Sequence, residues 1–143
     1  MTDPEPPTLA HYPLAENRPE LVRSRTGKPL AAITLDAVLA GEIGIEDLRI
    51  DAGALRAQAA IARAAGRPTL AENLERGADL VPVPQEVIMR VYELLRPGRA
   101  RARHELIVAA EELRNDYGAT TLATFIEEAA EVYERRGLFT YRF

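Results

Sequence analysis

Helical periodicity, interrupted by glycine and proline, is the feature that most constrains the fold of this chain. Between residues 84 and 137, apolar residues recur at intervals of three and four, which places them on one face of an α-helix. Three helices are predicted there, over 84–95, 100–117 and 121–136, with Pro84 as a first helical residue and Gly118 and Gly137 as stops. No segment alternates as a half-buried strand does. The chain is therefore predicted to be mostly α, with a small bundle in its C-terminal half.

The N-terminal half predicts shorter helices. Thr34 and Asp51 are expected N-caps for helices over 35–40 and 52–65, and a further short turn is expected over 45–48. Thr69 and Glu72 have the spacing of a capping box, which predicts a helix over 70–80. The alanine-rich face of 52–65 would let another helix approach closely. Gly77 is expected to weaken its own helix by about 1 kcal/mol relative to alanine.

These signals predict a small bundle of about four to five main helices preceded by an extended N-terminal arm. Residues 1–11, rich in proline and acids, are expected to be a flexible tail, and 12–143 a single domain. Within that domain, 12–33 is the arm, 34–137 the helical core and 138–143 an aromatic tail. That tail could fold back on its own bundle or dock on another subunit.

The composition excludes much chemistry. There is no cysteine, so no thiolate nucleophile or cysteine-ligated metal is available. The two isolated histidines, His11 and His104, argue against a histidine-built metal site or a catalytic triad. The net charge of −4 argues against nucleic-acid binding. No apolar run approaches the roughly 20 residues that span a membrane, and a cytoplasmic location is the default expectation. We therefore predict no catalytic, cofactor-binding or metal-binding residue on this chain.

Clusters of like charge are interpreted as surface. Four arginines lie where the helix expected over 84–95 ends and the next begins: Arg96, Arg99, Arg101 and Arg103. We expect them to form a solvated loop with ion pairs rather than a phosphate site. Two adjacent carboxylate pairs, Glu111-Glu112 and Glu127-Glu128, point in diverging directions on a helix, so they are expected on polar faces rather than in acid–base catalysis.

An ordered series of short motifs resembles the small subunit of adenosylcobalamin-dependent diol or glycerol dehydratase. The motifs include Tyr12-Pro13-Leu14, Arg18-Pro19, Thr26-Gly27-Lys28, Ile33-Thr34-Leu35, Asp47-Leu48-Arg49-Ile50, Val83-Pro84 and Leu95-Arg96-Pro97. The likeness spans nearly the whole chain apart from the N-terminal tail and the last residues. Gly77 departs from it, since an alanine is expected there.

The resemblance implies a helical, non-catalytic subunit that packs on a large subunit to assemble and stabilise the enzyme. The holoenzyme would contain large, medium and small subunits, as a dimer of heterotrimers, and would convert a vicinal diol to an aldehyde and water. Adenosylcobalamin and a monovalent cation, potassium, are implied for the holoenzyme and none on this chain. The resemblance leaves open the choice between glycerol and 1,2-propanediol, and whether the complex is packaged in a bacterial microcompartment.

The motifs also suggest which residues contact the partner. Tyr12, Leu14, Arg18 and Pro19 in the arm, with Arg96 and Pro97 at a helix end, are the predicted subunit-interface residues. The main alternative is a stand-alone helical adaptor unrelated to an enzyme. The small subunit of a dehydratase-reactivating factor should show strand patterns, which are absent here, and a DNA-binding regulator is disfavoured by the acidic balance.

Overall fold

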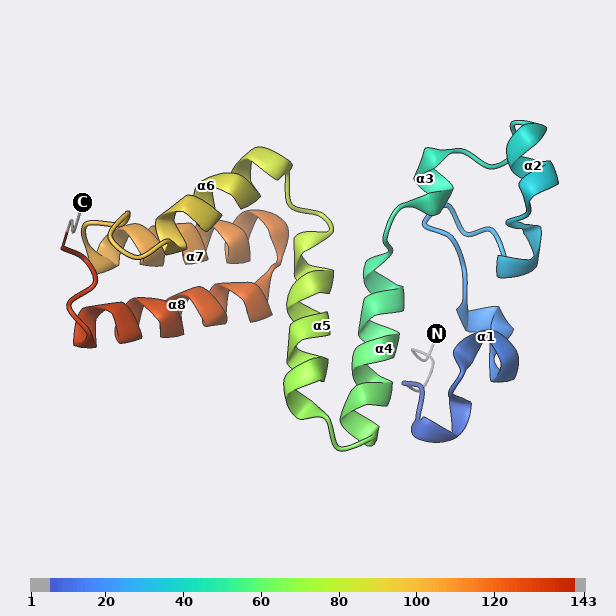
Figure 1. Ribbon diagram of the computed structural model, residues 1–143, viewed down its shortest axis with the longest axis horizontal. Coiled ribbons are helices and arrows are strands. Elements are labelled where there is room, and N and C mark those ends of the chain that lie inside the picture. Colours follow the sequence, from blue (N-terminus) through green and yellow to red (C-terminus); the bar gives the residue numbers. More distant parts are fainter. Residues whose placement is uncertain (1–5, 141–143) are drawn as a thin grey trace. The chain divides into compact units, whose positions relative to one another are not determined.

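The computed structural model describes residues 6–140 of the chain (Figure 1). Its contacts divide the chain into two compact units, Met1–Ala78 and Asp79–Phe143, here called the N-terminal unit and the C-terminal unit. Within the described residues the chain is helical and forms no strand beyond an isolated antiparallel bridge between Arg23 and Pro29. The mostly α class is confirmed. The single domain over 12–143 stays a prediction.

The N-terminal unit contains short helices followed by a helical hairpin. Its elements are the 3-10 turns η1 (Leu9–His11), η2 (Pro19–Leu21) and η3 (Leu30–Ala32), the helices α1 (Leu14–Asn17), α2 (Leu35–Leu39), α3 (Ile45–Leu48) and α4 (Ala52–Ala64), and most of α5 (Pro68–Leu80). Thr34 and Asp51 cap α2 and α4 as predicted, since their side chains accept from the backbone N–H groups of Ala37 and Ala54. Over 12–33 the chain forms short turns and loops, so an extended arm is not confirmed.

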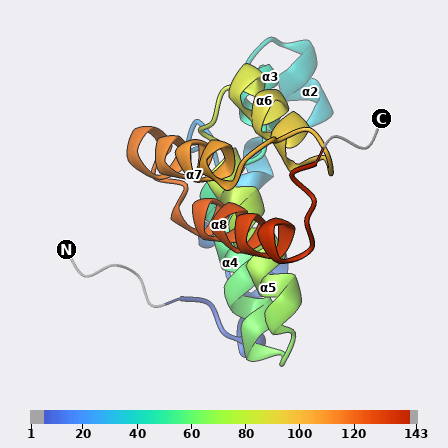
Figure 2. The same cartoon turned by 90° about the vertical axis from the view of Figure 1, so that its left-hand side faces the viewer.

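The C-terminal unit is a bundle of longer helices: α6 (Gln85–Leu95), α7 (Arg103–Tyr117) and α8 (Thr120–Arg135). Both views show α7 and α8 side by side (Figures 1 and 2). Gly118 and Gly137, at φ of 66° and 63°, follow these two helices in the left-handed region, where glycine is favoured. The Gly118 and Gly137 stops predicted from sequence are confirmed.

Three predicted helix starts are wrong. Helix α5 begins at Pro68, so Thr69 lies inside its first turn and forms no capping box before it. Pro84 has an extended ψ of 145°, and α6 begins one residue later. Helix α7 begins at Arg103 instead of residue 100, because the Glu105 carboxylate accepts from the backbone N–H groups of Arg101 and Ala102 at 2.8 and 3.1 Å.

Large apolar side chains fill the core of the C-terminal unit. Leu106, Leu113 and Ile126 are fully buried, as the helical periodicity predicts, and small alanines on α7 and α8 let these helices approach. Phe125, next to Ile126 on α8, is 39% exposed. Asp79 is buried beside this bundle, and its Oδ2 accepts from the Leu122 backbone N–H at 3.1 Å in the first turn of α8. The core therefore includes a carboxylate that satisfies a helix terminus.

The core of the N-terminal unit is small by comparison. Its buried cluster consists of Ala59, Ala62 and Ala71, with Leu74 packed against it. The predicted close approach of a helix to the alanine-rich face of α4 is confirmed, since α4 and α5 supply this cluster. A methyl group at Gly77 on α5 would lie 3.7 Å from Leu55 Cδ1 on α4.

The start of the aromatic tail folds back on its own unit. The Phe139 ring packs on Tyr133 of α8, with centroids 6.1 Å apart and planes tilted by 58°. The Leu138 carbonyl accepts from the Gly98 backbone N–H at 3.2 Å. Residues 141–143 of the predicted tail lie outside the described residues, as do residues 1–5 of the predicted N-terminal tail.

Candidate subunit interface

The arm candidates form a turn on the surface of the N-terminal unit. Tyr12 is 64% exposed, and its carbonyl accepts from Asn17 Nδ2 at 2.9 Å, which closes the α1 turn that begins at Leu14. Leu14 is half-buried and Pro19, the first residue of η2, is exposed. The Arg18 guanidinium bonds the Glu20 carboxylate and holds the pKa of that carboxyl below its usual value.

Tyr12 also lines a hollow of about 520 Å³ on the N-terminal unit. The walls come mostly from α4 and α5: Leu9, Gln58, Ile61, Ala62, Ala65, Arg67, Leu70 and Leu74. The hollow is lined chiefly by apolar side chains and places the arm candidate Tyr12 beside the helical hairpin.

Arg96 and Pro97 follow α6 in the C-terminal unit and are exposed. Arg96 Nη1 lies 2.9 Å from Glu93 Oε1 on its own helix, and its backbone carbonyl accepts from the Arg99 N–H at 3.0 Å. These contacts shape the turn after α6. For these two residues, as for the arm candidates, a contact with another subunit stays a prediction.

The charged clusters behave as surface features. Arg99 pairs with Glu93 at 3.8 Å, and Arg103 with Glu134 at 3.6 Å, so with Arg96 three of the four arginines form ion pairs as expected. His104 is exposed.

One residue of each carboxylate pair joins neighbouring helices through an ion pair. Glu112 pairs with Arg90 at 2.6 Å, and Glu127 forms a bidentate pair with Arg114 at 2.7 and 2.8 Å. Their partners in sequence, Glu111 and Glu128, are exposed. His11, for which the sequence indicates no partner, accepts at Nδ1 from the Thr8 backbone N–H at 3.0 Å.

A surface that the sequence predictions missed lies on α2 and α3. These two helices follow each other along the chain, within the N-terminal unit (Figure 1). Their large apolar side chains are exposed, and we call them together the α2–α3 surface: Leu35, Val38, Leu39, Ile45 and Leu48. The sequence shows the stripe, since apolar residues at 35, 38 and 39 fall on one side of a helix, but such a stripe ordinarily predicts a face turned toward the core.

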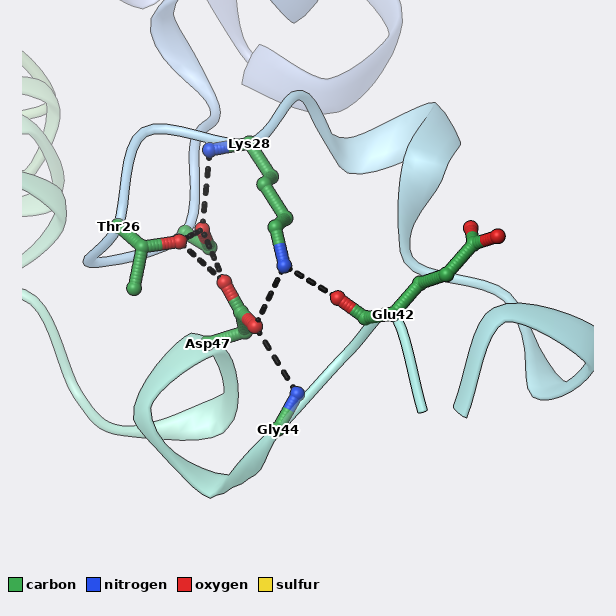
Figure 3. A network of polar contacts seen from close by, with 6 residues as sticks. Thr26, Lys28, Glu42, Gly44 and Asp47 are labelled. Atoms are coloured by element: carbon green, nitrogen blue, oxygen red, sulfur yellow. Dashed lines mark hydrogen bonds and ion pairs between the residues drawn. The ribbon is translucent and has the colours of Figure 1, made fainter. Parts of the chain in front are cut away.

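A buried carboxylate organises the segment beneath this surface. Asp47 on α3 is 6% exposed and accepts hydrogen bonds from Ser24 Oγ at 3.1 Å, from Lys28 Nζ at 3.0 Å and from the Gly44 backbone N–H at 3.0 Å, and also from Thr26 Oγ1 (Figure 3). Lys28 Nζ donates in addition to the Glu42 carbonyl. The motif around Thr26-Lys28 and the motif that begins at Asp47 therefore meet in one network.

The network keeps Asp47 ionised. Hydrogen bonds from Thr26, from the Gly44 backbone and from Lys28 hold the pKa of the Asp47 carboxyl well below its usual range. All of these donors bind the same carboxylate. Its hydrogen-bonding capacity is therefore met within the protein, and it presents no free group for catalysis. Its chemistry is that of a structural tie between the 24–28 loop and α3.

Metal binding and membrane insertion find no support in the described part of the chain. No group of three or more His, Cys, Asp or Glu side chains in residues 6–140 is placed to hold a metal ion. Nor does any helix there combine the length and apolar composition that crossing a bilayer requires.

Comparison with known proteins gives consistent matches along the chain. A family model described as dehydratase small subunit matches residues 8–140. The propanediol dehydratase small subunit of Salmonella typhimurium is 43% identical over 128 residues, covering 90% of this chain and 73% of the relative. The propanediol dehydratase small subunit of Citrobacter freundii is 44% identical over 128 residues, covering 90% of this chain and 74% of the relative. The family match includes every predicted interface residue.

Proposed function

Because this chain belongs to the dehydratase small-subunit family, we propose that it is the non-catalytic small subunit of a diol dehydratase. In this role it packs on the large subunit and stabilises a cytoplasmic holoenzyme of large, medium and small subunits, assembled as a dimer of heterotrimers. The holoenzyme converts a vicinal diol to an aldehyde and water. The stand-alone adaptor is not favoured, because the similarity extends over 90% of the chain.

The observation that carries the proposal is the unequal burial of the two units. The N-terminal unit buries a cluster of alanines, while several of its large apolar side chains, such as Leu35, Leu39 and Ile45, are exposed. Burying each such side chain would gain about 1.5–3 kcal/mol. A chain whose function is to pack on another subunit has a use for such side chains, whereas one acting alone would expose them to aggregation.

The cofactor requirements are assigned to the partner subunits. Adenosylcobalamin would supply radical chemistry to the holoenzyme when bound, and potassium is the implied cation. The described residues of this chain offer no cluster of metal-ligating side chains, and its buried carboxylate Asp47 is fully occupied by protein donors. In the proposed role both groups belong to the partner subunits, and this chain contributes to assembly.

Reconstitution tests the proposal. The chain is co-expressed with the large and medium subunits from the same genome, supplied with adenosylcobalamin and potassium, and assayed for aldehyde formation from 1,2-propanediol and from glycerol. Omitting this chain should reduce aldehyde formation and the yield of the complex at least tenfold. Equal activity and equal complex mass without the chain would rule out the proposed role.

The predicted arm contacts can be tested in the same system. The double variant Tyr12→Ala, Arg18→Ala should lower co-purification of the large subunit about tenfold while leaving the far-ultraviolet helical signal intact. The control is Val108→Ala with Arg136→Ala, which removes an exposed apolar side chain and an exposed arginine from parts of the C-terminal unit that carry no predicted interface residue. Unchanged complex yield in the arm variant would refute the assignment of Tyr12 and Arg18 to the interface.

A further inference from the structure

Helices α2 and α3 are inverted relative to the usual arrangement of a surface helix. On α2, Leu35 and Leu39 are 71% and 77% exposed, and they share one stripe with Val38. On α3, Ile45 is 69% exposed, whereas the charged residue Asp47 is buried. Apolar side chains thus face outward on both helices, and on α3 a carboxylate faces inward.

This inversion is held in place by specific contacts. Asp47 points toward the 24–28 loop, where Ser24, Thr26 and Lys28 bind it (Figure 3). With Asp47 directed inward, Ile45 and Leu48 are directed away from the loop, because residues two and one positions apart occupy different faces of a helix. Ile43, which follows α2, is buried, and its backbone N–H donates to the Ala37 carbonyl at 3.2 Å. The outward apolar face is therefore a defined conformation of the N-terminal unit.

The size of the α2–α3 surface matches the apolar part of a protein interface. At about 60–120 Å² of apolar area for a complete leucine or isoleucine side chain, its exposed fractions correspond to roughly 200–400 Å². A stable interface buries about 800 Å² on each partner, of which somewhat more than half, about 450 Å², is apolar. The surface could thus supply from nearly half to most of the apolar contact that such an interface needs.

Charges around the surface also fit a protein partner. Glu46, on α3, pairs with Arg49 at 3.1 Å and with Arg25 at 4.0 Å, and all three side chains are exposed. An apolar centre with a polar rim is the usual anatomy of a subunit interface. The exposed acids Asp36 and Glu42 would oppose adsorption to an anionic lipid surface.

We propose that the α2–α3 surface docks on the large subunit of the dehydratase, with the Asp47–Lys28 network positioning it. The proposal rests on the proposed function and identifies the part of this chain that makes the contact. The network acts before docking: it presents the apolar stripes in a fixed orientation, which reduces the ordering cost of association.

The test places a charge pair on the stripe without weakening the helix. The variant Leu35→Glu, Leu39→Lys introduces an i,i+4 pair with the acid in the first turn and the base in the last, which favours helix formation. The matched control is Asp36→Glu with Ala40→Lys. It carries the same pair of charges one residue later in the sequence, about 100° around the helix from the stripe at positions 35 and 39. Each full-length chain is co-expressed with the large and medium subunits, and the co-purified large subunit is quantified.

The stripe variant should lose co-purification at least tenfold, whereas the control should stay within twofold of the unmodified chain. Leu48→Lys on α3 should cause a loss in the same direction, and the circular dichroism of each isolated chain should remain helical. Co-purification of the stripe variant within twofold of the unmodified chain would overturn the proposal. So would loss of self-association by the isolated chain with retention of the large subunit, since the surface would then bind a second copy.

These outcomes distinguish failure of the surface assignment from failure of the proposed function. If the unmodified chain neither binds the large subunit nor raises aldehyde formation, the proposed function itself fails. If the unmodified chain does both and the stripe variant does them equally well, only the assignment of the surface fails.

Discussion

The two units of this chain are both helical, but they keep their shape in different ways. In the C-terminal unit, Leu106, Leu113 and Ile126 are fully buried, and ion pairs such as Arg114–Glu127 join the helices at their surface. In the N-terminal unit the buried cluster is made of alanines, and a polar network around Asp47 orders the loops. The difference shows that apolar content alone does not make a core. What matters is whether the apolar stripes have a helix of the same chain to pack against.

The largest expected effect tests this difference directly. Leu106→Ala removes a fully buried side chain from the C-terminal unit and should lower the free energy of unfolding by about 2–5 kcal/mol. Leu39→Ala, at a position 77% exposed, should cost less than about 0.5 kcal/mol in the isolated chain. Denaturant unfolding of the full-length chain measures both. Equal costs would show that the burial of the two units does not differ as described.

A smaller effect is expected at the polar network. Asp47→Asn replaces an acceptor of several hydrogen bonds and removes the charge that faces Lys28. Backbone amides over 23–48 should exchange at least about tenfold faster, while those of α7 and α8 stay unchanged. The control Asp36→Asn alters an exposed carboxylate on α2. Unchanged exchange in the Asp47 variant would mean that the network does not order this segment.

The same network predicts a pH dependence. The folded pKa of Asp47 is lowered from its ordinary 3.8, so its contribution is fully present above about pH 3.8 and is lost as the pH falls through the lowered value. In the unmodified chain, exchange over 23–48 should therefore accelerate relative to α7 and α8 only at acid pH. The Asp47→Asn variant should lack this additional acceleration, and retention of it would assign the acid sensitivity to another group.

The smallest effect concerns the contact between α4 and α5. Gly77→Ala should raise the free energy of unfolding by about 0.5–1 kcal/mol, because the new methyl group meets Leu55 at 3.7 Å and alanine favours the helix. Gly118→Ala is the matched control of opposite sign. At the Gly118 φ of 66°, a residue other than glycine is strained, at a cost of about 1–2 kcal/mol. A loss of stability in the Gly77 variant would indicate that α4 and α5 pack more tightly than this spacing allows.

Several elements could be predicted from the sequence because their signals are local. Thr34 and Asp51 accept from backbone groups three residues away, and Gly118 and Gly137 end helices through their own φ. Helix starts near proline were less predictable. Pro68 begins a helix, whereas Pro84 stays extended before one, and the same residue type permits both conformations.

The contacts that define the candidate surface were not predictable for a different reason. Asp47 meets Ser24, Thr26 and Lys28 across roughly twenty residues of chain, and Asp79 meets Leu122 across more than forty. No periodicity encodes such pairs. Likewise, the stripe at Leu35 and Leu39 is the signal of an inward face, and only the structure shows that it points outward.

Lys28, bound to Asp47 and Glu42, is the only lysine in the sequence. Among the side chains, an amine-directed reagent can therefore form a stable amide only there. The reaction requires an accessible nitrogen, and this nitrogen is engaged by the Asp47 carboxylate at 3.0 Å and by the Glu42 carbonyl. Covalent labelling at this single amine, followed by mass spectrometry, consequently reports how often the tie between the 24–28 loop and α3 opens. Labelling of Lys28 therefore monitors the loop that supports the α2–α3 surface. We propose that the chain joins the enzyme through this surface.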